Sequence, residues 1–349
     1  MKKLIHICFL LILPFCSQGI IGFQKPASNN AAGTQPVVKF TDPHLEAAIR
    51  KAIDKPTGDI YPGDLLELIG LSAFGKGIQS LSGLEHCVDL ESVYLWENQI
   101  SDISALAGLT ELTYIDLSSN QISDISPLSG LTNLLELHLP NNRVSDISAL
   151  SGLTNLWNLD LSYNLVSDIS VLSELVNLTV LDLSSNRISD LTPLAGLTNL
   201  MTLVLDSNQI SDISALSNLP DLSFLSLDSN PIDDSDIRVL SALTNLSFLS
   251  LKANGISDIS VLSGLPNLSS LYLGSNQISD ISALSGLINL KHLNLSSNLI
   301  SDVSALSGLT NLSELWLKDN PLDTSPGSPA RKIIDELIAN GCEVHFDEN

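Results

Sequence analysis

Hydrophobic residues recur along this chain with a fixed period. The unit that begins at Leu134 runs Leu-Leu-Glu-Leu-His-Leu-Pro-Asn-Asn-Arg-Val and follows the pattern Leu-x-x-Leu-x-Leu-x-x-Asn-x-(Ile/Val/Leu). Its asparagine recurs at positions 98, 120, 142, 164, 186, 208, 230, 254, 276, 298 and 320, in steps of 22 residues except for one step of 24. Self-similarity of this kind predicts a repeat protein in which each unit is completed by its neighbours.

Each unit is expected to contain one short strand. Leucines at the fourth and sixth positions share one face of that strand, so the third, fifth and seventh positions share the other. Further apolar residues, for example Ile122, Ile125, Leu128 and Leu131, turn inward from the return segment. A single unit cannot bury these residues alone, so the units stack into a continuous core. We expect the asparagine to satisfy backbone groups in the turn after the strand.

Aspartate fills a second polar column, mostly within Ser-Asp-Ile-Ser. An aspartate just before a short helical turn caps its free N–H groups. The alternative is an acidic ridge that condenses cations such as calcium, but the sequence shows no closed cage of oxygen ligands. We therefore predict no metal site and no cofactor. The column comprises Asp102, Asp124, Asp146, Asp168, Asp190, Asp212, Asp234, Asp258, Asp280 and Asp302.

The period with Ser-Asp-Ile-Ser-x-Leu-Ser-Gly-Leu-Thr-Asn-Leu resembles the internalin-type leucine-rich repeats of bacterial surface proteins. The resemblance covers residues 68–322. It implies an α/β solenoid, a right-handed horseshoe or rod with a parallel sheet on its concave side and 3₁₀ turns on its convex side. It also implies that the concave face binds a protein ligand. The chain shows no Leu-Pro-x-Thr-Gly signal and no immunoglobulin-like domain, so host-cell invasion is not implied.

The pattern divides the chain into five parts. Lys2 and Lys3 precede an apolar run, which predicts a signal peptide over residues 1–19 and a secreted or cell-surface protein without a membrane span in its mature chain. Lipidation of Cys16 and a retained anchor are the alternatives. A flexible linker is expected over 20–36, a helical N-terminal cap over 37–67, eleven full repeats and one degenerate first repeat over 68–322, and a C-terminal cap over 323–349.

Both caps are predicted to contain helices, because the ends of a solenoid expose its core. Asp42-Pro43 begins an amphipathic helix with an inward stripe of Leu45, Ala48, Ile49 and Ile53, and a second helix is expected over 62–68. The other cap is a helix over 329–340 with Ile333, Ile334, Leu337 and Ile338 inward, followed by a closing strand with Cys342, Val344 and Phe346 on one face. Cys87 replaces a buried leucine far from Cys342, so no disulfide is expected.

Composition narrows the classes of partner. The chain has 39 acidic and 16 basic residues, a net charge of −23, and this argues against nucleic acid as a partner. A hydrophobic content of 44% argues against disorder. We found no His-Glu-x-x-His, no Gly-x-Ser-x-Gly and no phosphate loop, so the protein is not expected to be an enzyme.

Function is expected to lie in the variable positions of the strands. Nine aromatic residues between Glu85 and Leu322 all fall at the second, third, fifth, seventh or eighth position, and exposed aromatic groups are typical of contact surfaces. Carboxylates between them favour a protein ligand with a basic patch, bound by a monomer. The predicted ligand-binding residues of the concave face are Tyr94, Trp96, Tyr114, Asp116, His138, Trp157, Asp160, Asp182, Asp206, Phe224, Asp228, Phe248, Tyr272, His292 and Trp316.

Two other functions use the same residues. A carbohydrate- or surface-polymer-binding adhesin would stack sugar rings on the aromatic side chains, and a structural envelope component would be indifferent to their mutation. The step of 24 residues adds two residues near Asp233–Arg238. They predict a longer helical turn on the convex side, with a dedicated binding bulge as the alternative.

Overall fold

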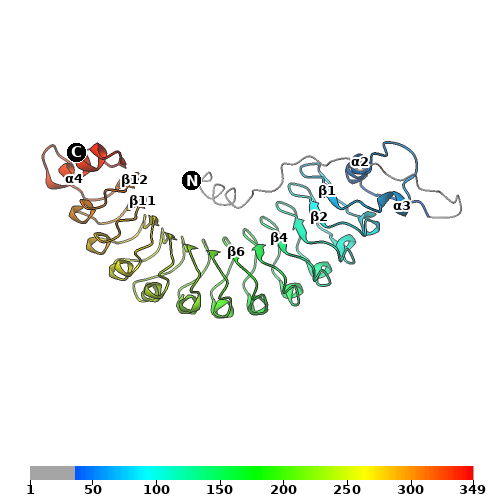
Figure 1. The fold of residues 1–349 in the computed structure, drawn as a ribbon, viewed down its shortest axis with the longest axis horizontal. Helices are drawn as coiled ribbons and strands as arrows, with labels where there is room; N and C mark the ends of the chain where they lie inside the picture. The colour runs from blue at the N-terminus through cyan, green and yellow to red at the C-terminus, as the bar shows by residue number, and fades with distance from the viewer. Residues whose placement is uncertain (1–35, 349) are drawn as a thin grey trace. The chain divides into compact units, whose positions relative to one another are not determined.

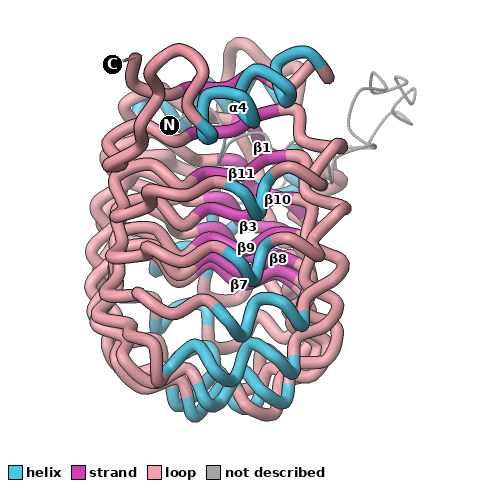
Figure 2. The backbone as a smooth tube through the Cα atoms, turned by 90° about the vertical axis from the view of Figure 1, so that its left-hand side faces the viewer, coloured by secondary structure: helices cyan, strands magenta, loops and turns pink. Residues whose placement is uncertain are grey.

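The computed structural model describes residues 36–348, which form one solenoid (Figure 1). The predicted signal peptide, the linker up to residue 35 and Cys16 fall outside the described residues. Within them, no helix is long and apolar enough to cross a membrane. The strands follow the concave side of the arc and short helices follow its convex side (Figures 1 and 2).

The solenoid carries one parallel sheet whose 13 strands lie in chain order. Every strand is three residues long, and its middle residue is paired with the middle residue of the next strand, as Leu137 is with Leu159. The strand register is the same across the 24-residue step, where Phe224 pairs with Phe248. The strands are β1 (Gly70–Ser72), β2 (Ser92–Tyr94), β3 (Tyr114–Asp116), β4 (Glu136–His138), β5 (Asn158–Asp160), β6 (Val180–Asp182), β7 (Thr202–Val204), β8 (Phe224–Ser226), β9 (Phe248–Ser250), β10 (Ser270–Tyr272), β11 (His292–Asn294), β12 (Glu314–Trp316) and β13 (Glu343–His345).

Short 3₁₀ helices form the convex side, as the period predicts. The one within the 24-residue step, η8, is the longest at seven residues, which confirms the predicted longer turn. They are η1 (Leu84–His86), η2 (Ser104–Leu106), η3 (Ser126–Leu128), η4 (Ser148–Leu150), η5 (Ser170–Glu174), η6 (Thr192–Leu194), η7 (Ser214–Asn218), η8 (Asp236–Ala242), η9 (Ser260–Gly264), η10 (Ser282–Leu284) and η11 (Ser304–Leu306).

The core lies between the sheet and these helices. Ile122, Ile125, Leu128 and Leu131 are each at most 1% exposed, which confirms the inward columns of the return segment. Cys87 takes a leucine position and is fully buried. Cys87 and Cys342 are both free thiols, as predicted, and burial raises the pKa of Cys87 to about 12.

The asparagine column joins each turn to the preceding repeat. Asn186 Nδ2 donates to the carbonyl oxygens of Leu161 and Leu183 at 2.9 and 3.0 Å, and its Oδ1 accepts the Val166 N–H at 2.9 Å. The residue before the asparagine has a left-handed backbone, with φ of 55° at Ser185. The asparagines therefore pair buried backbone groups in the turns, as expected from the sequence.

The aspartate column caps the convex helices. Asp102 Oδ1 accepts the Ser104 N–H at 2.8 Å, and this bond lowers the pKa of Asp102. Asp234 departs from the column, because its carboxylate accepts the N–H groups of Ser257 and Asp258 in the next repeat. The described residues contain no group of three or more His, Cys, Asp or Glu side chains arranged to hold a metal ion.

The N-terminal cap contains helices α2 (Pro43–Ala52) and α3 (Pro62–Leu65). Asp42 caps α2 through bonds from the N–H groups of His44 and Leu45, and its other carboxylate oxygen accepts the Gln79 N–H at 2.7 Å. One side chain therefore fixes the cap helix to the first repeat. The second helix ends at Leu65, three residues earlier than predicted.

The C-terminal cap contains helix α4 (Pro329–Ala339), followed by β13 against β12. Ala330, Ile334 and Leu337 are its buried residues. The prediction that Ile338 faces inward is wrong, since that side chain is 46% exposed. Only one narrow stripe of this short helix packs on the last repeat, and Ile338 lies beside it.

Candidate functional site

Side chains of the third, fifth and seventh positions form three rows across the concave face, because the strands share one register. The fifth-position row runs from β2 to β6 through five predicted site residues, each paired with the next: Tyr94, Asp116, His138, Asp160 and Asp182. The sheet thus places residues 22 positions apart in the chain side by side.

Aromatic rings gather near the N-terminal end of the sheet. Tyr94 and Tyr114 have ring centroids 4.8 Å apart, and Tyr114 lies 5.5 Å from His138. Trp96 stacks on Phe74 at 4.3 Å with ring planes 4° apart. Phe74 was missed from the sequence because it lies in the degenerate first repeat, although its seventh position there matches that of Trp96.

A second set of rings, here called the C-terminal ring ladder, consists of Phe224, Phe248, Tyr272, Trp316 and His345. The centroid distances between successive rings are 3.9, 5.4, 6.5 and 5.4 Å. His345 was missed because it lies in the cap strand. Tyr272 is only 8% exposed, so the expectation that it is open to a ligand is wrong.

His292 was expected among these rings and has a different partner. Its Nδ1 lies 3.3 Å from Glu314 Oε2, and within residues 36–348 it makes no ring contact with the ladder. The pair occupies third positions on β11 and β12, next to Trp316 in the fifth-position row.

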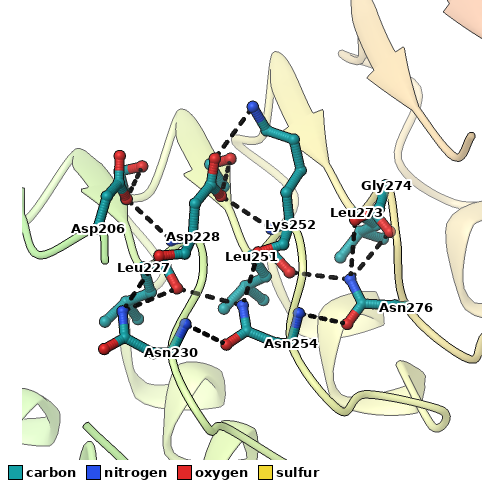
Figure 3. A network of polar contacts seen from close by, with 12 residues as sticks. Asp206, Leu227, Asp228, Asn230, Leu251, Lys252, Asn254, Leu273, Gly274 and Asn276 are labelled. Atoms are coloured by element: carbon teal, nitrogen blue, oxygen red, sulfur yellow. Dashed lines mark hydrogen bonds and ion pairs between the residues drawn. The ribbon is translucent and has the colours of Figure 1, made fainter. Parts of the chain in front are cut away.

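Asp206 and Asp228 occupy seventh positions and bind neighbouring repeats (Figure 3). Asp206 Oδ1 accepts the Ser226 hydroxyl at 2.6 Å and the Asp228 N–H at 2.8 Å. Asp228 repeats this arrangement one unit later, and its Oδ2 pairs with Lys252 Nζ at 3.0 Å. Burial, together with the charge of Asp228, raises the pKa of Asp206 to about 6. These two carboxylates therefore already have structural partners.

The carboxylates at the centre of the sheet are less exposed than the sequence suggests. Asp160 and Asp182 are 8% and 6% exposed, so the expectation of an open acidic surface is wrong for both. Burial, reinforced by the charge of Asp160, raises the pKa of Asp182 to about 8, and burial also raises the pKa of Asp160. Burial opposes the charge on His138, but Glu136, Asp160 and Asp116 outweigh it and raise the His138 pKa.

Trp157 lies apart from both ring groups. It is at the second position, just before β5, and its backbone N–H donates to the Leu135 carbonyl oxygen at 3.0 Å. Among the described residues it makes no ring contact with another aromatic side chain. Leu135, at the second position of the preceding repeat, is 41% exposed, whereas the second position of the next repeat is Thr179, so Trp157 has one exposed apolar neighbour in this column.

Comparison with known proteins gives the relatives of this chain. A family model described as leucine rich repeats (2 copies) matches residues 88–130, 110–152, 132–174, 154–196, 176–218, 244–286 and 288–329. The crystal structure of an internalin (inlF) from Listeria monocytogenes is 37% identical with a TM-score of 0.81, and the match covers 88% of this chain and 91% of that one. A search of curated protein sequences found no match.

Two further solved structures share the solenoid. The ectodomain of a plant membrane receptor kinase from Arabidopsis thaliana, solved in complex with Casparian strip integrity factor 2, is 25% identical with a TM-score of 0.67; the match covers 78% of this chain and 34% of that one. A leucine-rich repeat protein of Leptospira interrogans is 20% identical with a TM-score of 0.51, over 82% and 97% of the two chains, which indicates a shared fold.

Proposed function

We propose that this chain, which belongs to the internalin-type family of bacterial leucine-rich repeat proteins, is a non-catalytic scaffold that binds a protein ligand on its concave face. The C-terminal ring ladder is the observation that carries this proposal. Its rings lie on β8, β9, β10, β12 and β13, and Phe224, Phe248 and Trp316 keep part of their surface exposed. Rigid aromatic side chains of this kind supply most of the binding free energy at many protein interfaces.

The charge of the chain favours a ligand with a basic patch. A net charge of −23 attracts a cationic partner and speeds the encounter, while the apolar rings slow its dissociation. The plant receptor ectodomain, which has the same fold, was solved in complex with Casparian strip integrity factor 2. We extend the binding of a partner by this fold to the present chain and expect it to act as a monomer.

We also propose that the protein acts outside the cytoplasm, either secreted or held at the cell surface. The predicted signal peptide over residues 1–19 supports this location. Fractionation of cells that express the full chain is the test. Recovery from the medium or from the envelope agrees with the proposal, and recovery from the cytoplasm alone contradicts it.

The binding test compares two aromatic residues. Trp316 belongs to the C-terminal ring ladder, whereas Tyr163 is 62% exposed at an eighth position and makes no ring contact with the rings of the ladder in the described residues. Proteins are captured from envelope, medium and host extracts on the purified chain, and each captured protein is purified and titrated directly. We expect Trp316→Ala to weaken its binding about 30-fold or more, as for an interface anchor, and Tyr163→Ala to leave it unchanged.

Equal affinity of the two variants contradicts the proposed surface, provided that both melt at the wild-type temperature. Trp96→Ala tests the N-terminal rings in the same assay. Loss of binding in high salt favours the basic protein ligand, whereas binding that survives salt and is displaced by free sugars favours a carbohydrate ligand.

A further inference from the structure

Two asparagines of this chain, Asn254 and Asn340, are followed directly by glycine. Asparagine is one of the thermally labile residues. Glycine has no side chain, so its backbone nitrogen is open to approach and its backbone turns freely. In an Asn-Gly pair this nitrogen can attack the side-chain amide carbon of the asparagine. The fold decides which of the two pairs is free to react.

Asn254 belongs to the asparagine column, and its neighbours hold it in place (Figure 3). Its Nδ2 donates to the carbonyl oxygens of Leu227 and Lys252 at 3.2 and 3.1 Å, and its Oδ1 accepts the Asn230 N–H at 3.2 Å. The N–H of the glycine that follows donates to the Ile232 carbonyl oxygen at 2.8 Å. A reaction at this pair therefore requires the whole turn to open.

Asn340 is exposed at the end of helix α4, and among residues 36–348 its side chain makes no hydrogen bond. Gly341 has a φ of 93°, and the space where a Cβ would stand is open. The Gly341 N–H donates to the Ile338 carbonyl oxygen and the Cys342 N–H to the Leu337 carbonyl oxygen, at 2.9 and 3.0 Å, a common way for a helix to end at glycine. The bond to Ile338 must open before the Gly341 nitrogen turns toward the side chain, and helix ends fray.

We propose that Asn340 is a site of spontaneous deamidation and isomerisation. The Gly341 nitrogen, after loss of its proton, forms a bond to Cγ of Asn340, and the side-chain nitrogen leaves as ammonia. Water then opens the cyclic imide. Addition of water to Cγ breaks the new C–N bond and leaves aspartate. Addition to the backbone carbonyl carbon breaks the original peptide bond and leaves isoaspartate, whose chain continues through Cγ.

Either product changes the joint between α4 and β13. A carboxylate at position 340 lies at the C-terminal end of α4, where the helix dipole disfavours an anion. Isoaspartate also adds one atom to the backbone shortly before β13 begins at Glu343. Strand β13 carries His345, whose ring centroid lies 5.4 Å from that of Trp316. We therefore expect isoaspartate to displace the last ring of the C-terminal ring ladder.

The experiment incubates the purified full chain at mildly alkaline pH and follows the two Asn-Gly peptides by liquid chromatography and mass spectrometry after digestion in mild acid. Isoaspartate is identified by labelling with an isoaspartate methyltransferase. The same chain in urea is the reference, because there the fold protects neither asparagine. Asn340→Gln is the control variant, since its side chain would have to close a larger ring and reacts slowly.

In the folded chain we expect Asn340 to react about tenfold or more faster than Asn254, because Asn254 waits for local opening of its turn. In urea the two rates should be similar. Isoaspartate should appear at position 340, faster at higher pH, and should be absent there in Asn340→Gln.

Three results would overturn the proposed site. The first is a folded chain in which Asn254 reacts as fast as Asn340. The second is an intact Asn340 under conditions in which the chain in urea reacts. The third is aspartate at position 340 without isoaspartate, which would indicate direct hydrolysis of the amide in place of attack by the Gly341 nitrogen.

The effect on β13 is tested on the converted chains, which carry one more negative charge and are isolated by ion exchange. We expect the nuclear magnetic resonance signals of Trp316 and His345 to shift in these chains. Asn340→Asp, which adds the charge without the extra backbone atom, should leave them nearly in place. Equal shifts in Asn340→Asp, or no shift in the converted chains, overturn the proposed displacement of the ring.

The outcome is separable from that of the proposed function, because conversion of Asn340 is measured without any ligand. If Asn340 does not react but capture of the protein ligand still depends on Trp316, only the modification site is refuted. If Asn340 reacts and Trp316→Ala has no effect on capture, the ring surface is refuted instead.

Discussion

Removal of one asparagine from the turn column should destabilise the solenoid by an amount that follows from its hydrogen bonds. In Asn186→Ala the Val166 N–H, which is buried, loses its partner, at a cost of about 1–3 kcal/mol. The bonds to the carbonyl oxygens of Leu161 and Leu183 are also lost, at about 0.5–1.5 kcal/mol each. The free energy of unfolding should therefore fall by about 2–6 kcal/mol.

The two carbonyl groups keep this estimate from being larger. The Leu161 oxygen also accepts from Asn164, and the Leu183 oxygen also accepts from Asn208, so neither is left without a donor. Only the N–H of Val166 becomes a buried group without a partner. The column thus shares most of its acceptors between neighbouring asparagines.

Asn155→Ala is the matched control, because Asn155 is exposed and, within residues 36–348, its side chain makes one bond, to the Thr132 carbonyl oxygen at 2.9 Å. We expect it to cost about 1 kcal/mol or less. Both variants are unfolded in urea, followed by tryptophan fluorescence and circular dichroism. Stabilities that agree within about 0.5 kcal/mol would refute the hydrogen-bond account of the column.

Three further predictions concern single side chains. Asp42→Ala should lower the free energy of unfolding by about 2 kcal/mol at neutral pH. Burial alone would raise the pKa of Asp42, but hydrogen bonds from four backbone N–H groups outweigh it and lower the pKa. Urea titrations should therefore show the stability difference between wild type and variant vanishing as the pH falls through that lowered pKa. In the folded state Asp182 keeps its proton up to about pH 8, whereas in the unfolded state it loses the proton near the ordinary pKa of an aspartate. The free energy of unfolding of the wild type should therefore fall as the pH rises between these two pKa values, and Asp182→Asn should lack this part of the fall. Ser207 has a left-handed φ of 55°, so Ser207→Val should lower the melting temperature through a cost of about 1–2 kcal/mol, whereas Ser207→Gly should not.

The repeated columns could be predicted from the sequence because their roles depend only on local geometry. A strand places alternate residues on opposite faces, and a tight turn needs a side chain that pairs its backbone groups. The same requirement recurs in every repeat, so the period alone identifies the core, the asparagine column and the aspartate caps. Both free cysteines also followed from their columns and their separation along the chain.

The environment of the variable residues could not be predicted in this way. Asp182 and Tyr272 both look exposed in the pattern, yet both are buried, because side chains from neighbouring strands cover them on a concave surface. Cover of this kind depends on the curvature of the sheet and on which side chains meet across it. Phe74 and His345 were missed for another reason, since they join the ring groups from segments where the period breaks down.

The uniform register of the sheet sets how far apart its two aromatic groups lie. Each repeat adds one strand, whatever its length in residues, as the pairing of Phe224 with Phe248 across the longer repeat shows. The separation between Tyr114 and Phe224 is therefore adjustable only in whole strand spacings of about 4.8 Å. Duplication or deletion of one unit between them would change their separation by one such spacing while leaving both groups intact, and would retune the surface proposed for the ligand to a different span.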